Sequence, residues 1–362
     1  MQLKNRGTKK NWMPNNSKLQ KEYFLNESDD LANNINTKAN ELYFMLKYFD
    51  ASNLQITEEY KNYFIQHHLG RRLFFSIQNS AHIIYQSVKK TGKPFNEINF
   101  IDYGAGLGTL YMLAGMLDFK KVVYNDYLPD WKQTAQTICT ALQINIDDFV
   151  VGDIDAVMQH AAANNIQYQV IASRNVIEHI YSLPQFYAAI YKHNPAAVTY
   201  STTTANFHNP VMRWYHIYIH KTADKKYYQQ QRREEIVKLF PSISENKLAT
   251  FIKLTRGKGQ QDFLDAVNNL NNNKSVVVDK TLRSNTCDCL NGVWCEHLLT
   301  KNEYGKIIVN AGFKMNYQPG YWDTHYKWVA MNWAAKIFNK LILALDNKGI
   351  LLSPFVNVTA YN

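Results

Sequence analysis

The chain has 362 residues, of which 46% are hydrophobic, so it is long and apolar enough to bury a sizeable core. Its four cysteines are too few for a disulfide framework, and no run approaches the ~18 apolar residues that cross a bilayer. No apolar stretch of the signal-peptide kind follows the basic N-terminus. We therefore expect a globular, cytoplasmic protein without a membrane span.

The formal net charge of +10 is typical of proteins that meet an anionic partner, such as nucleic acid, a phosphorylated sugar or a membrane surface. Part of the excess gathers at the start of the chain, where Asn-rich, weakly apolar sequence predicts a flexible basic arm over residues 1–22. Such a tail is more often a solvated segment than a binding arm. Its basic residues are Lys4, Arg6, Lys9, Lys10, Lys18 and Lys21.

Residues 23–95 have a helical pattern that Gly92 and Pro94 end, which predicts a helical N-terminal lobe. Short apolar runs separated by helical stretches then follow. This alternation predicts an α/β fold, a doubly wound Rossmann-like sheet with helices on both faces, whose ligands bind at the carboxyl ends of the strands. The core is expected over residues 96–204, with strands near 98–104, 121–126, 148–153, 168–175 and 196–203.

The regular alternation is lost over residues 205–300, which we interpret as an inserted cap on the substrate side. It holds an aromatic, His-rich stretch, a charged Gln-rich helix and an Asn-rich loop, NNLNNNK. Residues 301–362 complete the core with a helix, a strand, a long helix near 326–345 and a final strand, ILLSPFVNVTAY. For the long helix, with its many apolar residues, we favour packing against the domain over attachment to a membrane surface.

The stretch NFIDYGAGLGTLYM, residues 99–112, places glycines at alternate positions between an expected strand and an expected helix. Glycine permits positive φ and close approach of a ligand, and the start of a helix offers free N–H groups. This predicts a bound, nucleotide-like cofactor. The dinucleotide fingerprint G-x-G-x-x-G needs a third glycine where this chain has Thr109, so a nicotinamide cofactor is disfavoured.

An acid followed by G-x-G-x-G resembles the first motif of class I S-adenosylmethionine-dependent methyltransferases. Asp126, 20 residues after Gly106, closes the second expected strand, where an acid can accept hydrogen bonds from ribose hydroxyls. The stretch IASRNVIEHIYSLPQFYAAIY, residues 171–191, is similar to the family's fourth-strand motif. The resemblance implies S-adenosylmethionine as the cofactor, and it implies a site made of Asp102, Tyr103, Gly104, Ala105, Gly106, Gly108, Asp126, Tyr127, Asp153, Ile154 and Asn175.

Two of these positions have another interpretation. Asp153, which the resemblance places against the adenine amino group, is also well suited to cap the helix that follows it, and both roles are compatible. Tyr103 is a candidate for simple packing beside the cofactor.

Methyl transfer to a hydroxyl benefits from a base or a metal. Asn175, Glu178 and His179 would lie on one helical face if Val176 began a helix, and we predict His179 as the base or acceptor-orienting group, with Glu178 beside it. Asn175 stands where relatives often have an acid, so we predict no metal there. His208, just after the fifth strand, is the second candidate base.

Two other groups of residues have metal-ligand chemistry. His216 and His220 are four residues apart, as metal ligands often are, although packing on a capping helix is the commoner use of such a pair. The segment TCDCLNGVWCEH has enough donors for one zinc ion, but its spacing differs from the usual paired C-x2-4-C pattern. We expect ordinary reduced thiols there. The donors are Cys287, Cys289, Cys295 and His297.

These patterns favour a methyltransferase that acts at oxygen on a small-molecule or glycan acceptor, with the cap aromatics Phe207, Trp214, Tyr215 and Tyr218 closing over it. Methylation of RNA or another nucleic acid is the alternative that the charge suggests, but the sequence has no recognisable RNA-binding module or base-methylation motif. A non-catalytic, cofactor-binding scaffold is the third interpretation.

Overall fold

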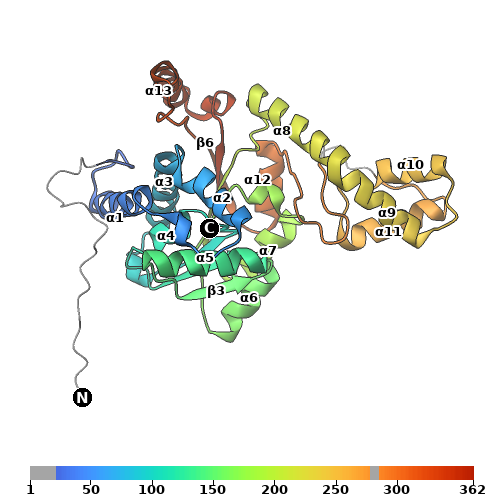
Figure 1. Ribbon diagram of the computed structural model, residues 1–362, viewed down its shortest axis with the longest axis horizontal. Helices are drawn as coiled ribbons and strands as arrows, with labels where there is room; N and C mark the ends of the chain where they lie inside the picture. The colour runs from blue at the N-terminus through green and yellow to red at the C-terminus, as the bar shows by residue number, and fades with distance from the viewer. Residues whose placement is uncertain (1–21, 278–284) are drawn as a thin grey trace. The chain divides into compact units, whose positions relative to one another are not determined.

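The computed structural model describes residues 22–277 and 285–362 (Figure 1). The basic arm predicted for residues 1–22 therefore lies, except for Glu22, outside the described residues. The chain forms two compact units. The first consists of Met1–Ala172 and Asp323–Asn332, and the second consists of Ser173–Trp322 and Trp333–Asn362.

The first unit begins with helices that are followed by alternating strands and helices. Its main elements are α1 (Asp30–Lys47), α2 (Glu58–Phe64), the π-helix η3 (Ile65–Leu69), α3 (Leu73–Thr91), β1 (Asn99–Tyr103), α4 (Leu110–Ala114), β2 (Lys121–Asp126), α5 (Pro129–Leu142), β3 (Asp148–Val151), α6 (Ile154–Ala163) and the start of β4 (Val170–Arg174).

The helical N-terminal region contains two breaks that the sequence pattern did not predict, one before α2 and one at Gly70. The helices α1 and α3 lie side by side and both contact α4 (Figure 1). Asp29 caps α1 by accepting from the backbone N–H of Ala32, and α3 ends at Gly92, whose φ of 66° is left-handed. Local capping residues therefore set the ends of both helices.

The second unit contains the rest of the fold. Its main elements are the 3-10 helix η5 (Ile177–His179), α7 (Leu183–His193), β5 (Val198–Thr203), α8 (Pro210–Ala223), the π-helix η6 (Asp224–Tyr228), α9 (Gln229–Leu239), α10 (Glu245–Leu254), α11 (Gln260–Asn271), α12 (Lys301–Asn310), β6 (Lys314–Pro319), α13 (Val329–Ala344, begun in the first unit), the 3-10 helix η8 (Asp346–Leu351) and β7 (Val356–Tyr361).

The seven strands have the order β3-β2-β1-β4-β5-β7-β6, and this confirms the doubly wound α/β fold. Pairing is parallel between β1 and β2, between β2 and β3, and between β1 and β4, whereas β7 is antiparallel to both β5 and β6. The order reverses beside β1, which is where open α/β sheets bind their ligands. Every residue of β1 and β5 is buried, as expected of strands with both faces covered.

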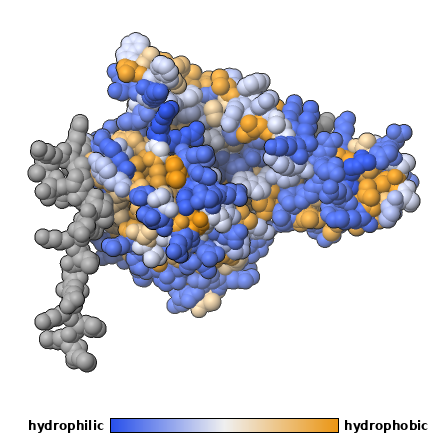
Figure 2. Space-filling model, in the orientation of Figure 1, coloured by the Kyte–Doolittle hydropathy of each residue, from blue (hydrophilic) through white to orange (hydrophobic). Residues whose placement is uncertain are grey.

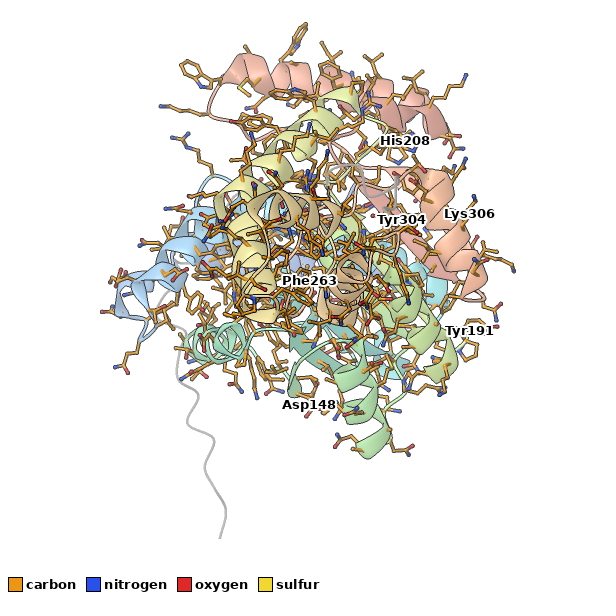
Figure 3. The ribbon with its side chains drawn as sticks, turned by 90° about the vertical axis from the view of Figure 1, so that its right-hand side faces the viewer. Asp148, Tyr191, His208, Phe263, Tyr304 and Lys306 are labelled. Carbon is orange, nitrogen blue, oxygen red and sulfur yellow. The ribbon has the colours of Figure 1, made fainter. Side chains whose placement is uncertain are left out.

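The insertion after β5 has a small core of its own. Helices α9 to α11 enclose a cluster of buried apolar side chains, with Phe263 of α11 among them (Figure 3). The predicted Asn-rich loop is partly helical, because α11 continues to Asn271 before the chain turns. The cluster consists of Ile236, Leu248, Phe251, Ile252, Phe263, Val267 and Cys289.

The C-terminal elements differ from the sequence expectation in two respects. The predicted final strand is strand only from Val356, because Leu351 and the residues before it form η8 and Pro354 follows. Helix α13 leaves many apolar side chains exposed, including Trp333 at 69%, and buries Ala335 and Ile342, so packing on the domain covers only part of it. In Figure 2, apolar residues lie on the surface among polar ones. No helix within residues 22–277 or 285–362 is long and apolar enough to cross a membrane.

Candidate functional site

The turn between β1 and α4 has the geometry of a ligand-binding loop. Gly104 and Gly106 have φ of +66° and +53°, which side chains rarely adopt. The backbone N–H of Gly106 donates to Asp126 Oδ2 at 2.9 Å, and that of Ala105 donates to the Asn125 carbonyl at 2.8 Å. The end of β2 therefore holds the glycine turn in place.

Asp126 is the acid around which this turn is arranged. Its Oδ1 accepts from the backbone N–H of Leu128 at 3.0 Å, so both carboxylate oxygens are held by backbone amides. Burial raises the pKa of Asp126, and the N–H groups of Leu128, Gly106 and Tyr127 partly offset that rise. A carboxylate oxygen has two lone pairs, so acceptor capacity for ribose hydroxyls is left.

Asp102 has a structural position instead. It is 2% exposed, and its Oδ2 accepts from the backbone N–H of Tyr111 at 2.9 Å, within the first turn of α4. An acid there satisfies an otherwise unpaired helix N–H and favours the helix dipole. Its contribution to a cofactor site is therefore to fix the direction in which α4 leaves the turn.

Tyr103, Asp153 and Ile154 lie together at the ends of β1 and β3. Burial, followed by the carboxylates of Asp153 and Asp126, raises the pKa of the Tyr103 hydroxyl, and the backbone amide of Ile154 hydrogen bonds to it. Asp153 caps α6, because its Oδ1 accepts from the backbone N–H groups of Asp155 and Ala156, as the capping interpretation predicted. Tyr127 is 44% exposed.

Sequence reasoning missed an aromatic group that covers the glycine turn. A Cβ atom on Gly106 would lie 3.2 Å from the ring of Trp131, the third residue of α5. Tyr60 and Tyr63 of α2 pack on that indole, with ring centroids 5.7 and 4.9 Å from it. No local sequence pattern marks these contacts, because the three aromatic residues reach the turn from other elements. The π-helix η3 after α2 also brings His68 near Gly108.

The turn after β4 carries the predicted catalytic residues, but it is not the α-helical turn considered from the sequence. Asn175 has a left-handed φ of 56° and is exposed, and its N–H donates to the Thr202 carbonyl at 2.7 Å. The 3-10 helix begins only at Ile177. The expected common face of Asn175, Glu178 and His179 therefore does not form.

Glu178 is almost completely buried, at 1% exposure. Burial raises the pKa of the Glu178 carboxyl above its ordinary value. The charge of His179 and a hydrogen bond with the Thr203 side chain offset only part of that rise. Oε2 has no hydrogen-bond partner in the described part of the chain. Such an arrangement fits a carboxyl that supports its neighbours and does not meet solvent.

His179 is oriented by the loop before α12. Its Nδ1 lies 3.0 Å from the Cys295 carbonyl oxygen, which can only accept, so this nitrogen carries the proton. Glu296 Oε1 lies 3.5 Å from the same nitrogen. In the neutral ring, Nε2 then holds the lone pair that a general base requires.

Glu296 also contacts the histidine pair of α8. His220 Nε2 lies 2.9 Å from Glu296 Oε2 and 3.4 Å from His216 Nδ1. Burial lowers the pKa of His216 to about 4, so this ring is neutral. Burial raises the pKa of Glu296, but the hydrogen bond from His220 and the nearby histidine charges leave that pKa below its ordinary value. Sequence reasoning missed Glu296, although it adjoins the Cys295 and His297 that were considered.

His208 has a different partner from the one predicted. Its Nε2 accepts from the backbone N–H of Lys301 at 3.0 Å and so caps the first turn of α12, whose Tyr304 and Lys306 are labelled with it in Figure 3. The Nε2 lone pair of His208 is therefore occupied by this hydrogen bond. His208 therefore supports α12 rather than presenting a free basic nitrogen.

The cysteine-rich segment brings two of its donors together, since Cys295 Sγ lies 3.4 Å from His297 Nε2, but it forms no group of three converging donors among the described residues. Cys289 lies in the apolar cluster of α9 to α11. Burial raises the pKa of the Cys289 thiol and of the Cys295 thiol to about 12. His297 Nε2 lies 2.9 Å from the Ile180 carbonyl oxygen. Of the residues that the structure describes, the group of three metal-ligating side chains that converges is His216, His220 and Glu296.

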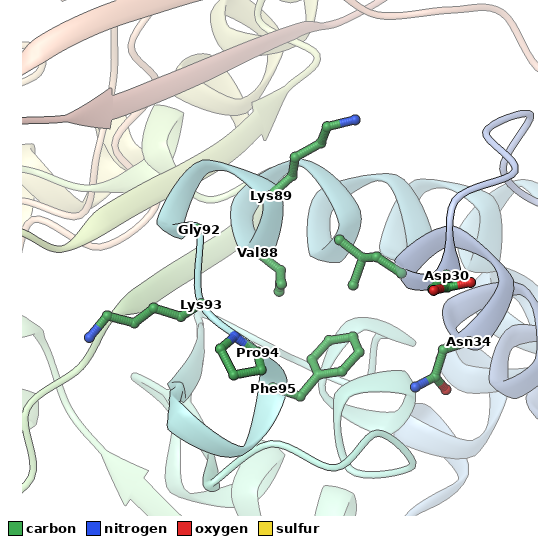
Figure 4. Close-up of a pocket in the computed structure, with 9 residues that line it drawn as sticks. Asp30, Asn34, Val88, Lys89, Gly92, Lys93, Pro94 and Phe95 are labelled. Atoms are coloured by element: carbon green, nitrogen blue, oxygen red, sulfur yellow. The ribbon is translucent and has the colours of Figure 1, made fainter.

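A hollow of about 390 Å³ lies elsewhere in the first unit (Figure 4). It is bordered by the start of α1, the end of α3 and the residues just before β1, including Asp30, Lys89 and Phe95. These residues precede the amino end of β1, whereas the glycine turn follows its carboxyl end. The hollow therefore contains none of the predicted site residues.

No protein-family model matches the chain, and no curated protein sequence matches it significantly. Solved structures that it matches include three methyltransferases. An S-adenosylmethionine-dependent methyltransferase from Mesorhizobium loti is 10% identical, with 77% of this chain and 98% of that one covered and a TM-score of 0.37. One from Clostridium acetobutylicum is 13% identical, with 41% and 59% covered and a TM-score of 0.33.

The third is the CurJ carbon methyltransferase, which is 12% identical, with 91% of this chain and 66% of that one covered and a TM-score of 0.41. The chain thus spans 59% of the Clostridium protein's length. All three are methyltransferases by name. Because one fold serves many reactions, the activity has to be argued from the site residues.

Proposed function

We propose that this protein is an S-adenosylmethionine-dependent methyltransferase that methylates an oxygen of a small-molecule or sugar acceptor. The observation that carries the proposal is the bond from Gly106 N–H to Asp126 Oδ2, at 2.9 Å. It joins a positive-φ glycine turn to an acid at the carboxyl ends of the parallel neighbours β1 and β2. That edge of a doubly wound sheet is where an adenosine-containing ligand binds.

Each part of the site has a separate task in this proposal. Asp126 would accept the ribose hydroxyls, and Gly104 and Gly106 would let the backbone approach the cofactor's amino-acid part. Trp131 and the tyrosines on it would cover the turn and exclude water from the sulfonium.

Once bound, the cofactor would supply the methyl group of its sulfonium to the acceptor oxygen and would itself become S-adenosylhomocysteine, and the hydroxyl proton would have to pass to a base. His179 is the proposed base, because Cys295 fixes its Nδ1 proton and Glu296 would stabilise the imidazolium. It follows β4, the parallel neighbour of β1.

The acceptor class is suggested by exposed aromatic faces on α8. Trp214 and Tyr218 are 67% and 58% exposed, and their rings stack with centroids 5.7 Å apart. Flat, exposed aromatic surfaces with polar edges suit sugars and other flat or hydroxylated molecules.

Calorimetric titration with S-adenosylmethionine tests the cofactor. We expect affinity near ~1 μM, or about −8 kcal/mol. Asp126→Ala should weaken binding by ~1–3 kcal/mol, since the ribose would lose charge-assisted hydrogen bonds. Asp148→Asn, at the amino end of β3, is the matched control and should bind normally. Absence of binding to the unaltered chain would remove the methyltransferase proposal.

Transfer of a labelled methyl group to a panel of sugars and phenols tests the base. His179→Ala should lower turnover by ~100-fold or more while cofactor binding stays intact. His193→Gln, in the last turn of α7, is the control that should retain turnover. Near-normal turnover of His179→Ala would show that another group takes the proton.

A further inference from the structure

Helix α8 places two histidines where a metal ion could bind them together. His216 and His220 are one helical turn apart, so their rings leave the same face of the helix. Both are buried, at 5% and 1% exposure. Glu296, from the loop that precedes α12, reaches them with a side chain that is 17% exposed.

We propose that His216, His220 and Glu296 form a binding site for a divalent first-row transition-metal ion. One ligand atom from each residue lies within 4.8 Å of the other two. Zinc–nitrogen bonds of ~2.1 Å in tetrahedral geometry separate neighbouring ligand atoms by ~3.4 Å. The separation of His216 Nδ1 from His220 Nε2 is 3.4 Å, so little movement is needed to bind an ion.

The donor set indicates the kind of ion. Two imidazoles and one carboxylate suit zinc and its first-row neighbours, whereas magnesium and calcium prefer oxygen ligands only. Three protein ligands leave a coordination position open for water or a ligand oxygen. The geometry therefore fits an open site better than a closed structural one.

The surroundings of Glu296 fit a ligand role. Its Oε2 faces His220, while its Oε1 lies 3.5 Å from His179 Nδ1, so the two oxygens have different partners. Metal-binding carboxylates are commonly oriented by such a second contact. This role is compatible with the proposed base, because Oε1 remains beside His179.

An ordinary ion pair is the competing explanation. The contact of 2.9 Å between His220 Nε2 and Glu296 Oε2 would then be complete in itself. It does not account for His216, which is buried with its Nδ1 3.4 Å from His220 Nε2 and which also hydrogen bonds with the Thr204 backbone. The two explanations differ in one measurable result: a metal site binds one added ion per chain, whereas an ion pair binds none.

The experiment uses the full chain, freed of metal with EDTA and dialysed. Cobalt(II) is titrated while its visible absorption is followed, and zinc binding is measured by equilibrium dialysis with elemental analysis. We expect one ion per chain. His216→Ala, His220→Ala and Glu296→Gln should each weaken binding by at least about tenfold, since even the loss of a residue that only orients a metal ligand costs ~10–100-fold in affinity.

Cys295→Ser and His297→Gln are matched controls from the cysteine-rich segment and should bind metal as the unaltered chain does. Circular dichroism shows whether each variant is folded. Hydrogen exchange of the unaltered chain gives a second measurement, in which zinc should protect the amides of His216–His220 and Glu296. No stoichiometric binding, or binding lost in the controls but kept in the three variants, would overturn the proposal.

This inference goes beyond the proposed function and does not depend on it. Cofactor binding is measured on the same samples by titration with S-adenosylmethionine. If metal binding fails while the cofactor binds, only the metal site is disproved. If the cofactor fails to bind while metal binds, only the methyltransferase proposal is lost.

Discussion

Gly106 has two separate reasons to lack a side chain. Its φ of +53° strains any residue with a Cβ atom, and that atom would lie 3.2 Å from the Trp131 ring. Gly92, at the end of α3, has a similar φ of +66° but nothing within 4 Å of the added atom. The two positions therefore separate backbone strain from crowding at the site.

We expect Gly92→Ala to cost only the strain, ~1–2 kcal/mol in the free energy of unfolding. Gly106→Ala should cost at least as much and should also weaken S-adenosylmethionine binding, because the indole must move. Denaturant unfolding and calorimetric titration measure the two effects. Equal cofactor affinity in both variants would show that the turn does not meet the cofactor.

His208 shows how a candidate base can be a structural residue. Removal of its side chain leaves the Lys301 N–H at the start of α12 without an acceptor. We expect His208→Ala to lower the free energy of unfolding by ~1 kcal/mol, a typical capping effect, without a large loss of turnover. A loss of turnover comparable to that of His179→Ala would contradict this assignment.

At the scale of elements, the helices inserted after β5 are held by a buried charge network as well as by their apolar cluster. Asp224 of η6 accepts from Thr286 Oγ1 at 2.6 Å and pairs with Arg232 Nη2 at 2.9 Å. Arg232 is 1% exposed, and its Nε donates to the Ile252 carbonyl of α10. The network therefore links the π-helix, α9, α10 and the segment before the cysteines.

We expect Asp224→Asn to destabilise the protein by ~3–5 kcal/mol, because it leaves a buried guanidinium without its carboxylate. The matched control is Glu245→Gln, which removes an ion pair with Arg233 whose members are 75% and 41% exposed. Exposed pairs contribute less than ~1 kcal/mol. Chemical denaturation followed by circular dichroism measures both, and similar effects would contradict the argument.

At the scale of the whole molecule, the two proposed ligands bind through residues of different compact units. The glycine turn and Asp126 belong to the first, and His216, His220 and Glu296 belong to the second. We expect S-adenosylmethionine to slow hydrogen exchange over 103–108 and 126–128, and zinc to slow it over 216–220 and 295–297. Ligand that binds only the native state also raises the free energy of unfolding, by ~2.7 kcal/mol at 100 times Kd.

Mass spectrometry of peptides after exchange gives this map. The variants that weaken the binding of each ligand, Asp126→Ala and His216→Ala, are the controls. At a ligand concentration just above the Kd of the unaltered chain, each should reduce only the protection that its own ligand gives. Protection by zinc over 285–297 that persists in His216→Ala would place the ion at the cysteines.

The alternation of strands and helices along residues 96–204 and the glycine turn could be predicted from the sequence, because both follow from local pattern. Apolar runs of strand length and the positive φ demanded at Gly104 and Gly106 depend on neighbouring residues in the chain. The same holds for the capping role of Asp153, which needs only the two amides that follow it. Where the local pattern was weak, as before Val356, the predicted final strand was longer than the observed one.

The partners of the histidines were decided by tertiary structure alone. Glu296 meets His179 and His220 from 117 and 76 positions away in the chain, and no spacing rule encodes such contacts. His208 likewise finds the Lys301 amide only because the insertion returns to the core at α12. The sequence determined which residues have the chemistry for a methyltransferase site, since residue types and turns are local. Contacts between residues far apart in the chain decided that the lone pair of His208 is occupied and that Glu296 converges with the histidines.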